Sequence, residues 1–287
     1  MPAATTHVEF AKDVLVKLTS HDKHRITNMP MFYLGSQGPD MLFFSRASLL
    51  PGHLHKLGNL MHEEKVYEVI SFFEEYAKND IDLNSYINGY LCHYALDSVA
   101  HPLICAVAKY NHEKSGVHEG TSHVSSEADI DIWMLHQRGR KVSSYDVFKY
   151  FKVDSKSRAK LAKMYHEMFK AVYDIDISEK RFAESIRDTA FYTWVLKPAK
   201  GIYTFANALE NALKMPHSFS GMILYNKSDT RVLNIERLSY PLRYDETNTI
   251  SASFPQLYGK AIFLAKKLIE GHDRSDFSLN FNGEPID

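Results

Sequence analysis

The segment 83–101 constrains the fold more than any other part of the chain. It is apolar on most faces of a helix, which predicts a helix buried on all sides. Its polar exceptions, His93, Asp97 and His101, recur every four positions, and at ~100° per residue they share one face within ~80°. We expect Pro102 to end this helix, because the residue before a proline is disfavoured in helical conformation. A buried helix needs other elements around it, so the segment indicates a multi-helix protein.

Apolar residues at helical spacing continue through most of the chain. They predict further helices over 8–20, 63–78, 122–138, 144–151, 155–173, 178–196, 199–213 and 254–271. Residues 30–61 have no clean helical period and predict a long loop of the kind that usually carries function. Strand-like alternation is scarce, and 230–240 is the one short extended candidate. We therefore expect an all-α fold.

The chain has no repeat, low-complexity tract or composition break that would separate domains. We expect residues 1–287 to form a single domain, with a metal-binding half over about 1–135 and a helical remainder over about 136–287. The 34 basic and 35 acidic residues give a net charge of −1, which makes nucleic acid an unlikely partner because no broad basic face is available. The two cysteines, Cys92 and Cys105, offer no disulfide framework.

No targeting or membrane-spanning segment is expected. The first ten residues, MPAATTHVEF, lack the apolar run of a secretory signal, and no stretch approaches 18 consecutive apolar residues. These observations favour a cytoplasmic location with reduced thiols.

The face formed by His93, Asp97 and His101 suits metal ions. Neighbouring members lie ~6 Å apart along the axis at ~1.5 Å rise per residue, a spacing at which two side chains can bind one ion. The outer two, ~12 Å apart, suit neighbouring ions rather than one. A buried carboxylate between histidines needs a partner or a metal, although a hydrogen-bonded pair remains the simpler alternative.

A second pair, His123 and Glu127, has the same spacing of four. Alone it is more typical of an exposed ion pair. Together with His101 it can supply two nitrogens and one oxygen to a zinc ion, with positions left for water or substrate. Asp131 follows one turn later, where it can hydrogen-bond to a metal-bound histidine.

These pieces together resemble the zinc-dependent phospholipase C superfamily, which includes bacterial phospholipases C, glycosylphosphatidylinositol-specific phospholipase D and, more distantly, zinc-dependent single-strand nucleases. The resemblance is closest to the phospholipase C and D-like branch and covers roughly residues 1–135. It is carried, in order, by Thr6 to Glu9, Gly38 to Asp40, Gly58 to His62, His93 to His101, and His123 to Glu127. It implies the all-α fold of that family and a cluster of two or three zinc ions.

The resemblance also implies a role for each ligand. Asp40, His62, His93 and Asp97 look like the ligands of a first zinc, and His101, His123 and Glu127 like those of a second. A third would be held by His7, a bridging Asp97 and the N-terminal amine, which becomes that of Pro2 if Met1 is removed. His55 stays open as an alternative to His62, which we prefer because it directly precedes a helix.

The implied activity is hydrolysis of phosphoric ester bonds by a phospholipase C-like phosphodiesterase. Zinc lowers the pKa of bound water to ~7 and supplies hydroxide at neutral pH, and Asp40 is the candidate to orient or deprotonate that nucleophile. The substrate is a phosphodiester, with phospholipid as one candidate. The alternatives are an intracellular phosphatase or nuclease-like phosphodiesterase with a soluble substrate, and a metal-binding protein with little turnover.

Overall fold

The computed structural model describes residues 4–48, 50–195, 200–213, 218–221, 223–224 and 229–286. These residues are predominantly helical, which confirms the all-α prediction. The elements are α1 (Ala4–Lys17), α2 (Ser20–Lys23), α3 (Met29–Gly35), η1 (Gly38–Leu42), η2 (Ser45–Ser48), α4 (His55–Glu63), α5 (Val66–Ala77), α6 (Ile81–Ser115), α7 (Glu119–Gln137), η3 (Val142–Ser144), η4 (Val147–Tyr150), α8 (Ser155–Tyr173), α9 (Glu179–Val195), α10 (Lys200–Leu213), α11 (Ser218–Gly221), η5 (Thr230–Leu233), β1 (Tyr240–Pro241), β2 (Thr249–Ile250), α12 (Phe254–Glu270) and η6 (Arg274–Phe277). The short strands β1 and β2 pair antiparallel, with Tyr240 opposite Ile250.

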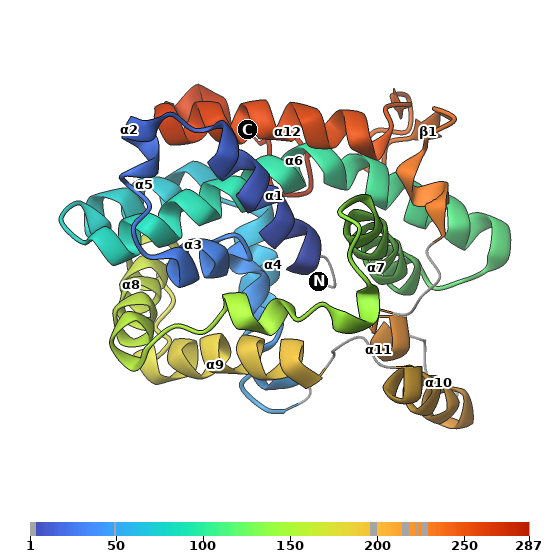
Figure 1. Cartoon of the computed structure of the whole chain (residues 1–287), viewed down its shortest axis with the longest axis horizontal. Coiled ribbons are helices and arrows are strands. Elements are labelled where there is room, and N and C mark those ends of the chain that lie inside the picture. Colours follow the sequence, from blue (N-terminus) through green and yellow to red (C-terminus); the bar gives the residue numbers. More distant parts are fainter. Residues whose placement is uncertain are drawn as a thin grey trace.

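Helix α6 is the central element, and α1, α3, α7 and α12 all pack against it (Figure 1). The Asp80 side chain caps its start by accepting hydrogen bonds from the backbone N–H groups of Asp82 and Leu83, and Gly116 ends it with φ of 70°. By length and composition α6 could cross a membrane, but 89% of its apolar window is buried inside the protein. Its apolar character therefore matches the predicted central helix.

The expected end of this helix at Pro102 is wrong, because α6 continues for another 13 residues to Ser115. A proline ring removes the N–H that would bond to the carbonyl four residues earlier, here that of Ser98. The C-terminal segment packs against this position. Gly283 has φ of 73°, and a Cβ there would lie 2.6 Å from the Ser98 carbonyl oxygen and 2.4 Å from the Pro102 ring. The close packing of Gly283 thus covers the point at which the helix continues through the proline.

The long loop expected over 30–61 is also wrong, because the segment forms α3, η1, η2 and α4. These elements are too short to display a clear period. Helix α3 crosses α6 at two glycines: a Cβ on Gly35 would lie 2.0 Å from the Tyr86 carbonyl oxygen, and one on Gly89 would lie 2.0 Å from the Phe32 carbonyl oxygen. This close crossing holds the η1 turn against the middle of α6.

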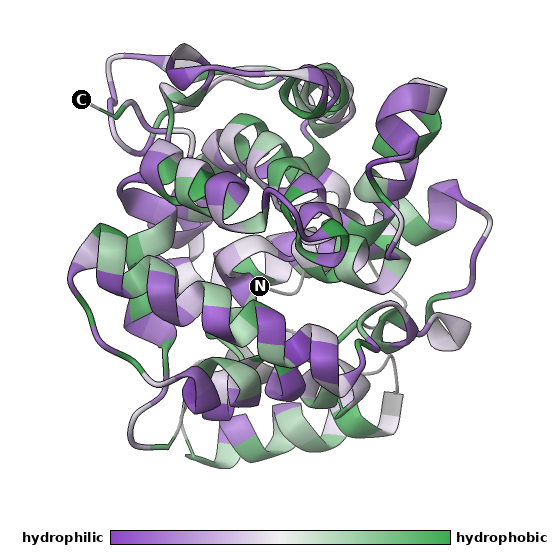
Figure 2. Ribbon diagram, turned by 90° about the vertical axis from the view of Figure 1, so that its left-hand side faces the viewer, coloured by the Kyte–Doolittle hydropathy of each residue, from purple (hydrophilic) through white to green (hydrophobic). Residues whose placement is uncertain are grey.

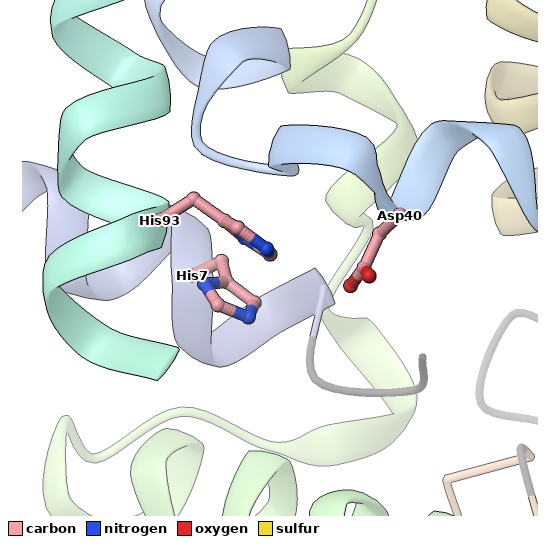
Figure 3. A group of neighbouring side chains, drawn as sticks. All are labelled: His7, Asp40 and His93. Carbon is pink, nitrogen blue, oxygen red and sulfur yellow. The ribbon is translucent and has the colours of Figure 1, made fainter. Parts of the chain in front are cut away.

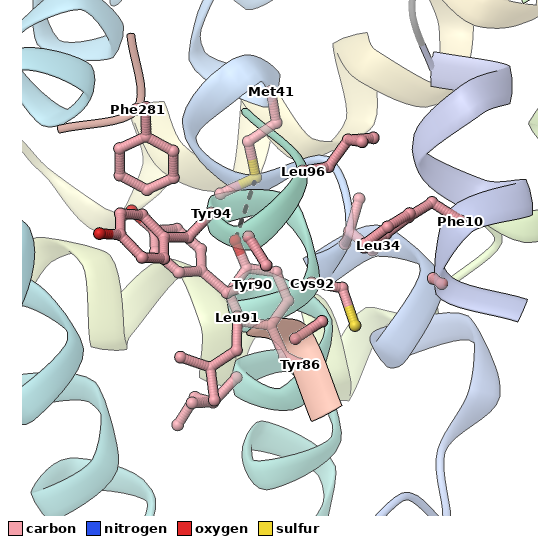
Figure 4. Packing of buried hydrophobic residues seen from close by; sticks show 14 of the residues in the cluster. Phe10, Leu34, Met41, Tyr86, Tyr90, Leu91, Cys92, Tyr94, Leu96 and Phe281 are labelled. Carbon is pink, nitrogen blue, oxygen red and sulfur yellow. Dashed lines mark hydrogen bonds between the residues drawn. The ribbon is translucent and has the colours of Figure 1, made fainter. Parts of the chain in front are cut away.

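A core of aromatic and aliphatic side chains surrounds α6. Tyr86, Tyr90 and Tyr94 fill one side of it together with Met41 and Phe281 (Figure 4). Purple and green segments alternate along the outer helices in Figure 2, as expected where one face of a helix is apolar.

The remaining helix predictions agree with the structure to within a few residues, with one exception. The segment 144–151 forms parts of the short 3-10 turns η3 and η4 instead of an α-helix. The extended candidate 230–240 contributes η5 and the start of β1. The expectation of one domain with two halves stays a prediction.

Candidate metal centre

The central helix presents its polar side chains on one face, as the spacing predicted. Asp97 lies between the two histidines, with its Oδ2 atom 3.1 Å from Nε2 of His93 and 3.7 Å from Nε2 of His101. All three side chains are buried. A carboxylate in this position can interact with two neighbouring ions at once.

Helix α1 adds His7 to the same carboxylate. Its Nε2 atom lies 3.3 Å from Oδ1 of Asp97, and its ring stacks on that of His93 with the centroids 4.2 Å apart. Figure 3 shows the two rings side by side, with the Asp40 carboxylate facing them across a short gap. Asp97 therefore contacts histidines from two helices through both of its oxygens.

The η1 turn and α4 supply Asp40 and His62. The Nε2 atom of His62 lies 3.2 Å from Oδ1 of Asp40. Gly38 permits this arrangement because it has φ of 51°, and a Cβ there would lie 2.1 Å from the ring of His93. Only glycine lets the turn approach α6 closely enough to aim Asp40 at the histidines.

Helix α7 completes the arrangement beside His101. The Oε1 atom of Glu127 lies 3.4 Å from Nε2 of His101 and 3.2 Å from Nε2 of His123. The His123 side chain is 26% exposed whereas that of Glu127 is 3% exposed, so this end of the cluster lies closest to solvent.

Among the residues that the structure describes, potential ligand atoms gather in three groups, each with its atoms within 4.8 Å of one another. The groups are His7, Asp40 and His93; His62, His93 and Asp97; and His101, His123 and Glu127. The first two share His93, so they form one continuous cluster with room for adjacent ions.

The outer ring nitrogens of three histidines are held by backbone carbonyls. The Nδ1 atom of His62 donates to the Gly58 carbonyl oxygen (2.7 Å). That of His93 donates to the Ser36 carbonyl oxygen (3.1 Å), and that of His101 to the Phe281 carbonyl oxygen (3.0 Å). A carbonyl can only accept, so Nδ1 carries the proton in each ring and Nε2 is left facing the carboxylates. Metal-binding histidines are commonly oriented in this way.

This arrangement leaves buried atoms that need a cation. With its proton on Nδ1, the neutral His93 ring points an Nε2 lone pair at a carboxylate oxygen, and within the described part of the chain that nitrogen has no hydrogen-bond partner. Either a proton or a metal ion must lie between the two atoms. Ligand atoms ~2.1 Å from a tetrahedral zinc lie ~3.4 Å apart, close to the 3.1 Å and 3.3 Å separations of Asp97 from His93 and His7. The residues present therefore fit zinc.

The pKa values show how the metal-free cluster balances its charge. Burial alone would lower the pKa of His101 and His123, but Asp97 and Glu127 raise the first to about 9, and Glu127 with Cys105 raises the second to about 10. Burial opposes ionisation of Asp97 and Glu127, yet the surrounding histidines hold the pKa of both below their usual range. Protons thus occupy the places that metal ions would take.

All eight ligands predicted from the sequence meet in this cluster: His7, Asp40, His62, His93, Asp97, His101, His123 and Glu127. Their metal-binding roles stay predictions. The alternative His55 lies at the start of α4, near His53 and Phe43 instead of Asp40. The expected part of Pro2 in a third site lies outside the described residues.

Two residues beside the cluster, Asp131 and Cys105, have contacts that the sequence did not predict. Asp131 does not bond to a ligand histidine, but accepts hydrogen bonds from Thr5 and Thr6 at the start of α1. No role at the site is predicted for Cys105 from the sequence, yet its Sγ lies 3.8 Å from Nδ1 of His123, the position at which His62, His93 and His101 face a carbonyl. Its position four residues after His101 was the available signal.

Residues 6–186 match the model of the family described as zinc dependent phospholipase C. The chain belongs to this family. Membership in the zinc dependent phospholipase C family agrees with the resemblance seen in the ordered motifs, and the match extends beyond residue 135 into α9.

The family supports a zinc-dependent hydrolase acting on phosphoric esters, and the buried clusters are able to hold metal. No curated protein and no solved structure matches the chain.

Proposed function

We propose that the chain is a phospholipase C-like phosphodiesterase that uses two or three zinc ions. The observation that carries the proposal is the buried set of histidine Nε2 atoms facing carboxylate oxygens at 3.1–3.7 Å. Protein carboxylates and imidazoles at these separations suit a shared zinc.

The ligands divide along the contacts. Asp40, His62, His93 and Asp97 would hold one ion, and His101, His123 and Glu127 a second. His7 contacts both Asp97 and His93, so a third ion would lie at its side of the cluster. Asp97 is the bridging ligand in this scheme, because its two oxygens face different histidines.

The site suits an anionic substrate. Zinc would supply a hydroxide near neutral pH and positive charge for the phosphoryl oxygens. The carboxylates of Asp40, Asp97 and Glu127 offset only part of that charge. An activated serine or cysteine is unnecessary here, and Cys92 is buried in the apolar core with its pKa raised by burial.

Asp40 is the proposed catalytic residue. Burial would raise its pKa, but in the metal-free chain the close contact with His62 and the charge of His93 hold the pKa at about 2. The carboxylate is therefore ionised at neutral pH and can accept a hydrogen bond from a nucleophilic water. This favours orienting the water over storing its proton.

The exposed face of α10 favours phospholipid among the candidate substrates. Ile202, Phe205, Leu209 and Leu213 lie on one side of this helix with exposed fractions of 37%, 71%, 48% and 58%. Helix α10 packs against α11, which in turn packs on α7, the helix that carries His123. Amphipathic helices of this kind gain free energy at a lipid interface.

The proposal is tested by turnover of an aryl phosphodiester before chelation, after chelation and after zinc is restored. A phosphomonoester, single-stranded DNA and phosphatidylcholine vesicles are run in parallel. The proposal expects zinc-dependent hydrolysis of the diester. Hydrolysis of the monoester alone would favour the phosphatase, and full zinc loading with no turnover would favour a metal-binding protein.

A paired substitution separates lipid from soluble substrate. Phe205→Ser should slow hydrolysis of vesicles and leave the soluble diester unchanged. Phe263→Ser is the control, because Phe263 is 77% exposed on α12. Equal vesicle rates in the two variants would favour a soluble substrate. The cytoplasmic location expected from the sequence stays a prediction.

A further inference from the structure

Asp131 joins the two halves of the cluster through the start of α1. It lies on α7 one turn after Glu127 and is 1% exposed. Its Oδ1 accepts hydrogen bonds from the backbone N–H (2.7 Å) and the hydroxyl (2.6 Å) of Thr6, and its Oδ2 accepts one from the N–H of Thr5 (3.2 Å). The first N–H groups of a helix lack partners within the helix and favour a negative charge. A carboxylate from a distant helix therefore anchors the turn that carries His7.

His7 depends on this anchor more than the other ligands do on theirs. His62, His93 and His101 each have Nδ1 held by a backbone carbonyl, and His123 has Cys105 beside it. The Nδ1 atom of His7 is buried without a hydrogen-bond partner in the described part of the chain. Its orientation is set by the position of α1, by stacking on His93 and by the contact of Nε2 with Asp97.

We propose that Asp131 is a positioning residue for His7. Asp131 fixes the orientation of His7 indirectly, by holding the backbone of Thr5 and Thr6. Backbone carbonyls fix the rings of His62, His93 and His101 directly. Helix α7 also carries Glu127. One helix therefore sets the distance between His7 and the group formed by His101, His123 and Glu127. The inference uses the metal-binding part of the proposed function and does not depend on the reaction.

Removal of Asp131 need not unfold α1. The next turn of the helix has its own anchor, since the buried Glu9 carboxylate lies 2.8 Å from Nε of Arg138 and 3.0 Å from Nη1 of Arg140. Variants of Asp131 should therefore keep the fold and loosen the first turn. Loss of an outer-shell partner of a metal ligand typically weakens metal affinity by ~10–100-fold.

The test is zinc affinity measured by competition with a chromophoric chelator, without any activity assay. Asp131→Ala should weaken one class of zinc by about 10–100-fold, and Asp131→Asn less, because its amide can still accept from Thr6. Asp154→Ala is the control: Asp154 caps α8 by accepting hydrogen bonds from two backbone N–H groups and a serine hydroxyl of that helix.

A double-mutant cycle with His7→Ala separates positioning from general stabilisation. If Asp131 acts through His7, Asp131→Ala causes no further loss of zinc affinity in the His7→Ala background. The absorption bands of cobalt-loaded protein should change in Asp131→Ala and stay unchanged in Asp154→Ala. Wild-type affinity in Asp131→Ala, or additive losses in the double variant, would overturn the inference. Zinc binding without hydrolysis would overturn only the proposed function.

Discussion

Asp97 is the residue on which the cluster depends most. It contacts His7, His93 and His101 through two oxygens, and each of these rings reaches it from a different turn or helix. An asparagine in its place would keep the shape of the side chain but remove the negative charge that two ions would share.

Asp97→Asn should therefore abolish hydrolysis and lower the zinc content by more than one ion per chain. The loss of affinity should exceed the ~100-fold upper range for an outer-shell partner. Elemental analysis with circular dichroism as the folding control measures this. Full zinc content and near-normal activity in the variant would show that Asp97 does not bridge.

His62 and His55 provide a matched pair within α4. His62 faces Asp40 with its ring held by the Gly58 carbonyl, whereas His55 contacts His53 and Phe43. His62→Ala should cost at least tenfold more zinc affinity and activity than His55→Ala. A reversed order would move the first-site assignment to His55.

Zinc uptake should release protons, because neutral imidazole is the ligand form. With pKa values of about 9 and 10, His101 and His123 are protonated at pH 7 in the metal-free chain, and zinc must displace both protons. Affinity should rise as pH increases through the range of these two pKa values. Calorimetry in buffers of different ionisation enthalpy counts the protons. Uptake without proton release and with pH-independent affinity would contradict the assignment.

The raised pKa values of His101 and His123 also make the stability of the metal-free protein depend on pH. A histidine whose pKa is raised by folding stabilises the fold fully below its unfolded pKa of ~6.5, and that stabilisation is lost as pH rises through the folded value. Apoprotein stability should thus fall between neutral pH and about pH 10.

Residue types and spacing predicted the candidate ligands His93, Asp97, His101, His123 and Glu127, whereas the resemblance to the family supplied His7, Asp40 and His62. Neither predicted the hydrogen-bond partners of these side chains. The carbonyls that orient the rings belong to Gly58, Ser36 and Phe281. Every residue has a backbone carbonyl, so the residue type does not indicate which one accepts a hydrogen bond. The spacing that places Asp131 near the cluster likewise does not say which donor it meets, so it suggests a histidine where the structure has Thr5 and Thr6.

At the level of elements, the crossing of α3 and α6 brings Asp40 to the histidines. The crossing depends on Gly35 and Gly89, where a side chain would collide with backbone. Short elements and close crossings are poorly predicted from periodicity, which is why 30–61 read as a loop. The sequence around Pro102 also predicts the end of a helix, because it does not show that Gly283 packs against this position.

Gly89→Ala should destabilise the protein by about 1–3 kcal/mol or more, the usual range for overpacking, and should weaken zinc binding by displacing η1. Gly259→Ala is the control, because a Cβ at Gly259 meets nothing within 4 Å. That change should be neutral or stabilise by up to ~1 kcal/mol. Denaturant unfolding compares the two, and equal stabilities would show that the crossing tolerates a wider spacing.

In the whole molecule, the metal centre is assembled from distant parts of the chain. Ligands come from α1, η1, α4, α6 and α7, and the C-terminal segment holds His101 through Phe281. Local patterns predicted most of the helices, whereas the docking of α1 on α7 and of the C-terminal segment on α6 rests on contacts between residues more than a hundred positions apart.

The most direct test of a multinuclear zinc centre is a titration of metal-free protein with zinc, in which bound ions per chain and aryl phosphodiester hydrolysis are measured in the same samples. The account predicts no turnover in the metal-free protein and a rate that appears only after more than one ion is bound. Full turnover without zinc, or saturation at one ion or none, would contradict it.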